Sequence, residues 1–342
     1  MNHLHRICVV PAYAGVGGPA SFSMRFRAGA ERLGIEICTD LDDHPYDAVL
    51  VIGGSRQLVK LWQVRQAGIP IVQRLDGFNW LHRRVKTSLT YRAGAEIRNW
   101  ILRIIRRHLA TRIVYQSKFV VHRWNQTFGE VDKPYDVIHN GVDLDEFSPQ
   151  GYGAPPDDHM RIVMVEGTYL GGYDFSLKLG IDLANLLQEQ YHLEVELVVA
   201  GLILPELQQK WQRYAQVPVT WLGVVDRSEI PQLHRSAHVF FSGELHPACP
   251  NAVIEALACG LPVATFDTGS LAEIVTGDAG RVVPYRADSW SLEEPDLAEM
   301  GEAVMEIYHN QPRFRDAARQ RAEKSFNIVG VVDQYLEALR RA

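Results

Sequence analysis

The sequence predicts an α/β fold made of two open parallel sheets in two domains. Short apolar runs of strand length alternate with segments of helical periodicity along the whole chain. This rhythm occurs twice, on either side of a stretch rich in turn-forming residues at 139–158. The length of 342 residues also exceeds what one hydrophobic core usually holds. We therefore expect an N-terminal domain at 1–150 and a C-terminal domain at 151–315.

The first domain begins with a strand at 6–10, a glycine-rich turn at 14–19 and a helical pattern through Phe22, Phe26, Ala30 and Leu33. This order is typical of dinucleotide-binding units, although the G-x-G-x-x-G spacing is absent. Gly17 and Gly18 would let the backbone approach a phosphate; the alternative is a plain tight turn. Further strands are expected at 48–52, 70–73, 112–115 and 136–138.

The second domain repeats the strand-helix alternation, and residues 316–342 follow it as an amphipathic helix expected to pack back toward the first domain. Strands are expected at 162–165, 195–200, 219–222, 238–241, 262–266 and 280–283, and helices at 176–190, 204–215, 228–236 and 250–259. Open α/β sheets bind ligands beyond the carboxyl ends of their strands, so we expect a cleft where two such sheets face each other.

Composition narrows the class of protein. Residues 1–150 carry 20 Lys and Arg against 14 Asp and Glu (+6), and the remainder carries 15 against 27 (−12), so the halves differ in charge. The four cysteines have neither disulfide-framework nor zinc spacing and are expected to be reduced and buried. No apolar run could span a bilayer or serve as a secretory signal, which predicts a cytoplasmic protein.

The helix expected at 250–259 has the features of an anion-binding element. Pro250 suits a first helical turn, and Gly260 with Pro262 ends the helix. The backbone N–H groups of 250–253 would favour a phosphate or a sugar hydroxyl. Glu255 lies just over a turn inside. Helix packing alone explains the apolar residues but not this carboxylate. The alternative to a binding role for Glu255 is an ordinary solvent-exposed helix residue.

Three segments in order resemble glycosyltransferase family 4, the retaining group 1 enzymes of the GT-B fold. They are HNGVDLDEF at 139–147, VTWLGVVDRSEIPQLHRSAHVFFSGE at 219–244 and CPNAVIEALACGLPVATFDTGSLAEIV at 249–275. The resemblance implies two Rossmann-like domains facing each other across a cleft. It also implies a nucleotide-sugar donor on the C-terminal domain, an acceptor on the N-terminal domain, and no obligatory metal or other cofactor.

The family motif Glu-x7-Glu assigns roles to particular residues. Its second glutamate, which bonds the donor ribose, matches Glu255, whereas its first falls on Pro247. Glu244 and His246 are therefore the expected replacements for the missing sugar contact, with ordinary loop residues as the alternative. The backbone around the helix start is expected to bind the donor. Its residues are Cys249, Pro250, Asn251 and Ala252.

Two other family positions depart from the pattern. The arginine that binds the diphosphate falls on Thr168, which leaves Lys178 as the nearby cation, with a surface role as the alternative. In the first domain the family often has His-Gly where this chain has Asp76-Gly77, so Asp76 joins the catalytic candidates. Arg74 is a candidate replacement cation for the diphosphate, and a surface salt bridge with Asp76 is the competing interpretation.

Residues 83–112 form a basic stretch in which hydrophobic residues are interspersed. Nine cations face one acid, Glu96. Such a helix can lie on an anionic membrane surface, at the inner face of the membrane in this case. The alternative is a core-facing helix with a solvated basic face; a nucleic-acid patch is less favoured because no recognition motif accompanies it.

The leading hypothesis is a retaining glycosyltransferase that moves a hexose to a glycan or lipid-linked acceptor in cell-envelope or polysaccharide synthesis. Two alternatives remain. One is a nucleotide-sugar epimerase of similar architecture, which would need acid and base residues that cannot be assigned. The other is a degenerate family member that binds a nucleotide sugar or glycan without turnover.

Overall fold

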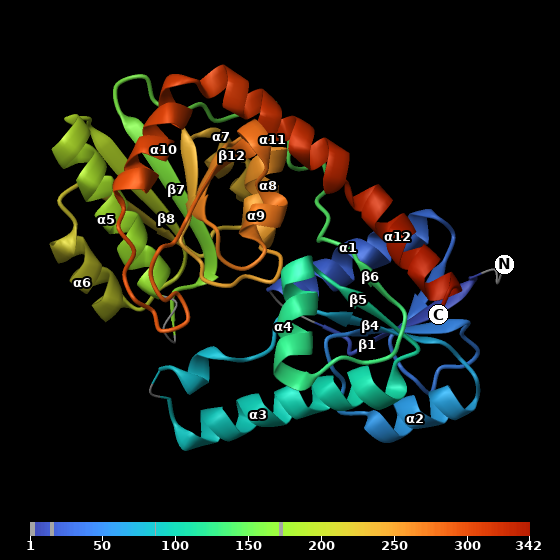
Figure 1. Cartoon of the computed structure of the whole chain (residues 1–342). Coiled ribbons are helices and arrows are strands. Elements are labelled where there is room, and N and C mark those ends of the chain that lie inside the picture. Colours follow the sequence, from blue (N-terminus) through green and yellow to red (C-terminus); the bar gives the residue numbers. More distant parts are fainter. Residues whose placement is uncertain (1–3, 14–16, 86, 171–173) are drawn as a thin grey trace. The chain divides into compact units, whose positions relative to one another are not determined.

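The computed structural model describes residues 4–13, 17–85, 87–170 and 174–342, and it divides into two compact units (Figure 1). Unit 1 comprises residues 1–141 and 328–342, and unit 2 comprises 142–327. The boundary expected at 150 thus lies nine residues beyond the end of the first segment of unit 1. The chain leaves unit 1 after Gly141 and returns to it at Ile328.

Unit 1 contains a six-stranded parallel sheet in the order β2-β1-β3-β4-β5-β6. Its strands are β1 (Arg6–Val10), β2 (Glu36–Cys38), β3 (Ala48–Ile52), β4 (Ile71–Leu75), β5 (Arg112–Tyr115) and β6 (Tyr135–Val137). Its helices are α1 (Gly18–Arg32), α2 (Leu58–Gln66), α3 (Leu89–Ile104), α4 (Lys118–Phe128) and α12 (Ile328–Arg340), with a 3₁₀ turn η1 (Leu81–Arg83) and a π turn η2 (Ile105–Leu109). Strands β3 and β4 are buried throughout because helices cover both faces.

One face of this sheet packs against α1 and α12, and the other against α2 and the end of α3. Phe22 on α1 and Tyr335 on α12 have ring centroids 4.9 Å apart, which joins segments from the two ends of the chain within one core. Ser88 and Ser117 begin α3 and α4, where each hydroxyl accepts a backbone N–H three residues on. The last helix is therefore part of the unit 1 core.

Unit 2 contains a second six-stranded parallel sheet, in the order β12-β11-β10-β7-β8-β9. Its strands are β7 (Met160–Thr168), β8 (Val195–Leu202), β9 (Val219–Gly223), β10 (Val239–Ser242), β11 (Val263–Phe266) and β12 (Gly280–Val283). Its helices are α5 (Asp174–Tyr191), α6 (Pro205–Tyr214), α7 (Ile230–Arg235), α8 (Asn251–Ala258), α9 (Leu271–Ile274), α10 (Ala298–His309) and α11 (Gln311–Ser325), with 3₁₀ turns η3 (Arg227–Glu229) and η4 (Gly277–Ala279).

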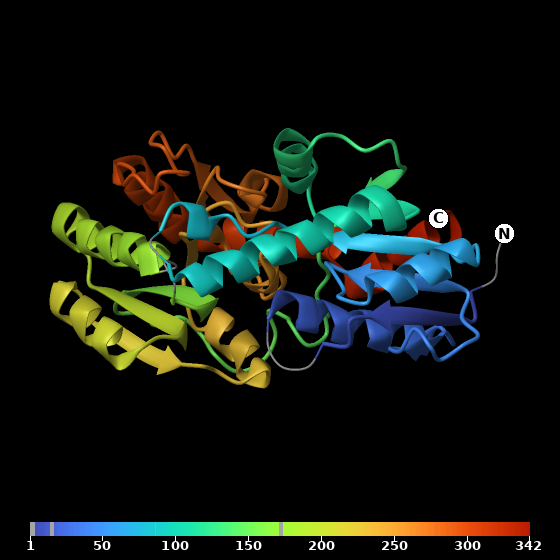
Figure 2. The same ribbon diagram turned by 90° about the horizontal axis from the view of Figure 1, so that it is seen from below.

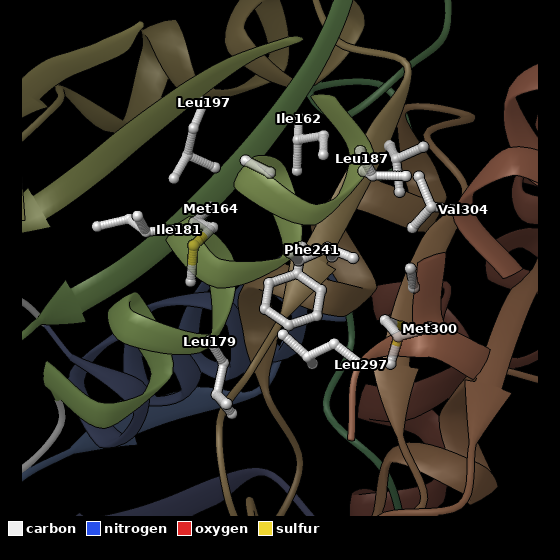
Figure 3. Packing of buried hydrophobic residues seen from close by; sticks show 14 of the residues in the cluster. Ile162, Met164, Leu179, Ile181, Leu187, Leu197, Phe241, Leu297, Met300 and Val304 are labelled. Carbon is white, nitrogen blue, oxygen red and sulfur yellow. The ribbon is translucent and has the colours of Figure 1, made fainter. Parts of the chain in front are cut away.

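The core of unit 2 lies on both faces of its sheet. On one face, side chains of the central strands interdigitate with those of α5 and α10, as Phe241 does with its neighbours in Figure 3. On the other face α8 and α11 cover β10 and β11. Gly280 begins β12 where a Cβ would collide with the carbonyl oxygen of Val263, so this strand pair requires glycine. The sheet is thereby fixed behind α8.

Two expectations from the sequence are wrong in detail, and one strand lies outside the expected set. The terminal segment is not one helix, because α11 ends at Ser325 and α12 begins at Ile328. Strand β2 is not among the expected strands, since it has three residues of which only Cys38 is buried. Arg106 belongs to no basic surface: it is buried and donates to Tyr115 Oη at 2.9 Å and to Asn125 Oδ1 at 2.6 Å. The four cysteines are free and buried as expected.

Candidate functional site

Helix α8 begins at the carboxyl end of strand β10 in unit 2. Pro250 is its N-cap residue, and no side chain among the described residues caps the helix. Because Pro250 has no N–H, the first backbone donors are those of Asn251, Ala252 and Val253. The donors expected from the sequence, at 250–253, are thus reduced to these three. Cys249 is buried against the helix face. This end of α8 can thus present backbone donors to an anion.

Glu255 lies on the buried side of α8 and is only 8% exposed, so it is not a solvated helix residue. Arg227 Nη1 lies 3.6 Å from Glu255 Oε1. The Arg227 guanidinium also packs over the ring of Phe147 at 5.1 Å and pairs with Glu146 at 3.1 Å. Arg227 is therefore a cation beside the predicted ribose-binding carboxylate.

Arg227 is not among the residues predicted from the sequence. The family has its arginine after β7, whereas Arg227 follows β9 and lies 28 positions before Glu255. The available signal was its place beyond the carboxyl end of a strand, at the same edge of the sheet as α8.

Glu244 follows β10 by two residues and lies close to Glu166, near the end of the neighbouring strand β7. Burial raises the pKa of Glu244 to about 7. Burial, and then the charge of Glu244, raise the pKa of Glu166 well above its ordinary value. Tyr169 is completely buried beside them, and the charge of Glu166 adds to burial in raising its pKa. Burial and their mutual repulsion therefore disfavour ionisation of both carboxyl groups at once.

The loop after Glu244 is tightly held. Thr268 Oγ1 donates to the carbonyl oxygen of Glu244 at 3.3 Å, and Ser270 N donates to that of Pro247 at 3.0 Å. His246 has a φ of 57° and its ring stacks on Trp290 at 3.4 Å between centroids. Pro247 is itself buried. Glu244 and His246 thus come from one ordered loop at the same end of the sheet.

The two diphosphate-binding candidates of unit 2 differ in their surroundings. Thr168 ends β7, and its hydroxyl accepts the backbone N–H of Leu170 at 3.2 Å. Lys178 on α5 donates to Asp182 Oδ2 at 2.7 Å and to Glu294 Oε2 at 2.9 Å. Burial opposes the effect, but these bonds raise the Lys178 pKa. The charge of Lys178 is therefore already balanced within unit 2.

The unit 1 candidates gather at the carboxyl end of β4. Arg74 is buried, stacks over Phe22 at 4.0 Å and donates to Asn140 Oδ1 at 2.8 Å. The surface salt bridge with Asp76 is wrong, because Arg74 is not at the surface. Burial raises the pKa of Asp76 although the positive charge of Arg74 opposes it, and the charge of Asp76 adds to burial in raising the pKa of Tyr13 after β1.

Gly17 and Gly18 begin α1, where Gly17 has a φ of 121° that favours glycine. A Cβ at either position would meet no heavy atom within 4 Å in the described residues, so the space beside them is open. The rest of the predicted glycine turn, residues 14–16, lies outside the described residues.

Each unit thus groups its own candidates at the carboxyl ends of its strands. Within the described residues no set of three or more His, Cys, Asp and Glu side chains could hold a metal ion. No helix in the described ranges is both long and apolar enough to cross a membrane.

Part of unit 2 matches a known family model. Residues 173–310 match the family model of Glycosyl transferases group 1. The chain is 26% identical over 147 residues to one component of human phosphatidylinositol N-acetylglucosaminyltransferase, an alignment that covers 41% of this chain and 28% of that protein. It is 31% identical over 133 residues to a GDP-mannose-dependent phosphatidylinositol dimannoside mannosyltransferase of Mycobacterium tuberculosis, covering 38% of this chain and 32% of that one. The chain thus spans less than half the length of these curated relatives.

Solved structures resemble the chain over nearly its whole length. Sucrose-phosphate synthase from Thermosynechococcus elongatus superposes with a TM-score of 0.73 at 16% identity, covering 98% of each chain. HepE of Anabaena, in complex with UDP-glucose, superposes with a TM-score of 0.71 at 16% identity, covering 99% of this chain and 100% of that one. These likenesses show the GT-B fold, with its two Rossmann-like sheets.

Proposed function

Because residues 173–310 match the family model of Glycosyl transferases group 1 and the chain has the GT-B fold, we propose that this protein transfers a hexose from a nucleotide sugar to a glycan or lipid-linked acceptor, with retention of configuration. Unit 2 would bind the donor and unit 1 the acceptor. No metal or other cofactor would be required.

Glu255 carries this proposal. It is a buried carboxylate, and it lies one turn inside a helix that no side chain of the described residues caps. A carboxylate there can accept both hydroxyl protons of a ribose, while the helix N-terminus and Arg227 stabilise the departing diphosphate. Arg227 would supply the cation that Thr168 does not. The UDP-glucose bound to HepE supports a uridine nucleotide as the first donor to try.

Isothermal titration with UDP-, GDP-, dTDP- and ADP-sugars, with and without magnesium, tests the donor site. We expect one donor to bind without metal and Glu255→Gln to weaken its binding about 10-fold or more, because a charge-assisted hydrogen bond is lost. Glu206→Gln, which removes an exposed carboxylate from α6, is the matched control and should leave affinity unchanged. Equal affinities for both variants would remove the assignment of Glu255.

Retention of configuration requires a separate measurement. The anomeric configuration of the first product, read by NMR before mutarotation, should match that of the donor. The opposite anomer would reject a retaining mechanism while leaving the donor site intact.

One observation favours a second function, nucleotide-sugar binding without transfer. Lys178 is neutralised by Asp182 and Glu294, and Thr168 has no charge, so two candidate positions contribute no free positive charge to a leaving diphosphate. Donor binding with neither transfer nor slow donor hydrolysis would support this function.

Unit 1 would meet the acceptor at a membrane surface of anionic lipid. Leu89, Ile97 and Trp100 are 81%, 57% and 54% exposed, and their spacing puts them on one stripe of α3, the long helix at the bottom of Figure 1. Arg92 and Arg103 are exposed on the same helix, and their charges would attract anionic lipid. Lys86, another cation of the basic stretch, lies outside the described residues.

Flotation with vesicles of phosphatidylcholine, with and without phosphatidylglycerol, tests this surface. Trp100→Ser should reduce binding to the anionic vesicles severalfold, whereas Trp62→Ser, which removes an equally exposed tryptophan from α2, should not. Equal losses in both variants would count against α3. Such a site would put the protein at the inner face of the membrane, in the cytoplasm.

A further inference from the structure

Three arginines of unit 1 come from the segment that follows β4 and from helix α4. Arg83 ends η1, Arg84 follows it, and Arg123 projects from α4, the short blue-green helix near the top of Figure 2. The Arg123 guanidinium carbon lies 5.3 Å from the centre of the Phe78 ring. Burial, and then the positive charges of Arg83 and Arg84, lower the pKa of Arg123. The charges of these three side chains act on one another, and we call them the arginine cluster.

Two members of the cluster differ in how their charge is balanced. Arg83 holds the carboxylate of Glu96 with two bonds of 2.8 and 2.9 Å. His82 Nε2 also lies 2.9 Å from Glu96, and these bonds, Arg83 first, lower the Glu96 pKa to about 2 although burial opposes them. Arg84 forms no ion pair within the described ranges and is exposed. Its charge is therefore available to a ligand.

Like charges held close together repel, and an anion placed between them relieves the repulsion. Guanidinium groups present paired donors to the oxygens of a phosphate, a geometry that a lysine cannot offer. Arg84 is exposed and Arg123 is half-buried on an aromatic ring, so one is accessible and the other is fixed in place.

Arg83 and Arg84 lie on the same segment as the catalytic candidate Asp76. That segment runs from the end of β4 through Phe78 to Arg84. Trp124, next to Arg123 on α4, donates its indole N–H to the carbonyl oxygen of Asp76 at 2.9 Å. This bond holds the start of the segment against α4, the helix that carries Arg123.

We propose that Arg84 and Arg123, assisted by Arg83, bind a phosphate group of the glycosyl acceptor and so place an acceptor hydroxyl at Asp76. This assignment rests on the proposed transfer reaction. The acceptor is then an anionic phosphate ester. Its phosphate belongs either to a lipid headgroup or to a soluble phosphorylated compound, because both present the same oxygens to the guanidinium groups.

Titration with glycerol phosphate, in the presence of saturating nucleotide sugar to fill the donor site, tests the cluster. We expect binding to weaken about 10-fold or more in Arg84→Gln with Arg123→Gln, and severalfold in Arg84→Gln alone. The single variant alters an exposed side chain and should keep the fold even if the double variant does not. Arg32→Gln, at the exposed end of α1, is the control and should bind as the unaltered protein does.

Vesicles distinguish the two sources of phosphate. Arginine-dependent binding to phosphatidylglycerol vesicles with none to glycerol phosphate would support a lipid acceptor, and the reverse a soluble one. Unchanged binding of both probes by Arg84→Gln and by a folded double variant would overturn the proposal that these arginines bind phosphate. Arginine-dependent phosphate binding in a chain that binds no nucleotide sugar would reject its assignment to a glycosyl acceptor while showing that the anion site itself exists.

Discussion

The paired carboxyl groups of Glu166 and Glu244 predict an unusual dependence of stability on pH. Burial raises the Glu244 pKa from the ordinary 4.5 to about 7, so the folded chain binds more protons than the unfolded chain between these values. The stability that this group contributes should therefore be fully present below pH 4.5, fall as the pH rises through this window, and be lost above pH 7. The full difference corresponds to roughly 3 kcal/mol.

Glu244→Gln removes this ionisation while keeping the shape of the side chain. Glu244 is partly exposed, so solvent reduces the effect. We expect the free energy of unfolding of the variant at pH 8 to exceed that of the unaltered chain by about 1–2 kcal/mol. At pH 5 the two should be nearly equal. Urea unfolding followed by tryptophan fluorescence at both pH values measures the difference.

Glu196→Gln is the matched control, because it changes a carboxylate of the same sheet whose pKa is shifted in the opposite direction. Burial opposes the shift, but bonds from Thr220 and from Arg161, at 2.7 and 2.6 Å, lower the Glu196 pKa. This variant should be less stable than the unaltered chain at pH 8. The difference in stability should shrink as the pH falls below 4.5. If Glu244→Gln were destabilising by the same amount at both pH values, the assignment of a raised pKa to Glu244 would be wrong.

Three further outcomes follow from packing in the two cores. Gly280→Ala should prevent soluble folding, since its Cβ would collide with the carbonyl oxygen of Val263 beside strand β12; expression at low temperature with recovery of native fluorescence would contradict this. Gly180→Ala meets the flexible end of Met164 instead, and should lower the thermal midpoint by several degrees without preventing folding. Arg74→Met should cost about 1–3 kcal/mol in urea unfolding, because the buried side-chain oxygen of Asn140 loses the hydrogen bond that Arg74 donates; an unchanged midpoint would count against that bond.

The sheets could be predicted from the sequence because their strands are buried on both faces and read as apolar runs. The runs at 48–52 and 280–283 form strands with the expected ends. A short strand with few buried residues does not produce such an apolar run, which is why β2 was not predicted. The break between α11 and α12 was also missed, since both helices keep an apolar stripe and the chain passes to unit 1 only at Ile328.

The position of a candidate side chain on its helix could be predicted from the neighbouring sequence. Glu255 follows its helix start by a few residues, so periodicity places it on α8 without knowledge of the tertiary structure. Charge balance is not local. Glu294, which neutralises Lys178, is 116 positions away, and Glu255 meets Arg227 across 28. Only the folded unit shows which cation is already paired and which lies beside Glu255, the carboxylate predicted to bind the ribose.

The same distinction would allow an acidic unit to bind the proposed anionic donor. The net charge of −12 in residues 151–342 counts carboxylates that are held elsewhere: Asp278 pairs with Arg313 at 2.6 Å, and Glu306 pairs with Arg281. Both pairs lie on η4, α10, α11 and the start of β12, at the opposite end of that strand from its carboxyl terminus. At an ionic strength of about 0.1 M, salt screens exposed charges over roughly 10 Å. These ion pairs therefore contribute little to the electric field at the start of α8. The first N–H groups of α8 and Arg227 act at contact distance, so local donors decide the sign of the site.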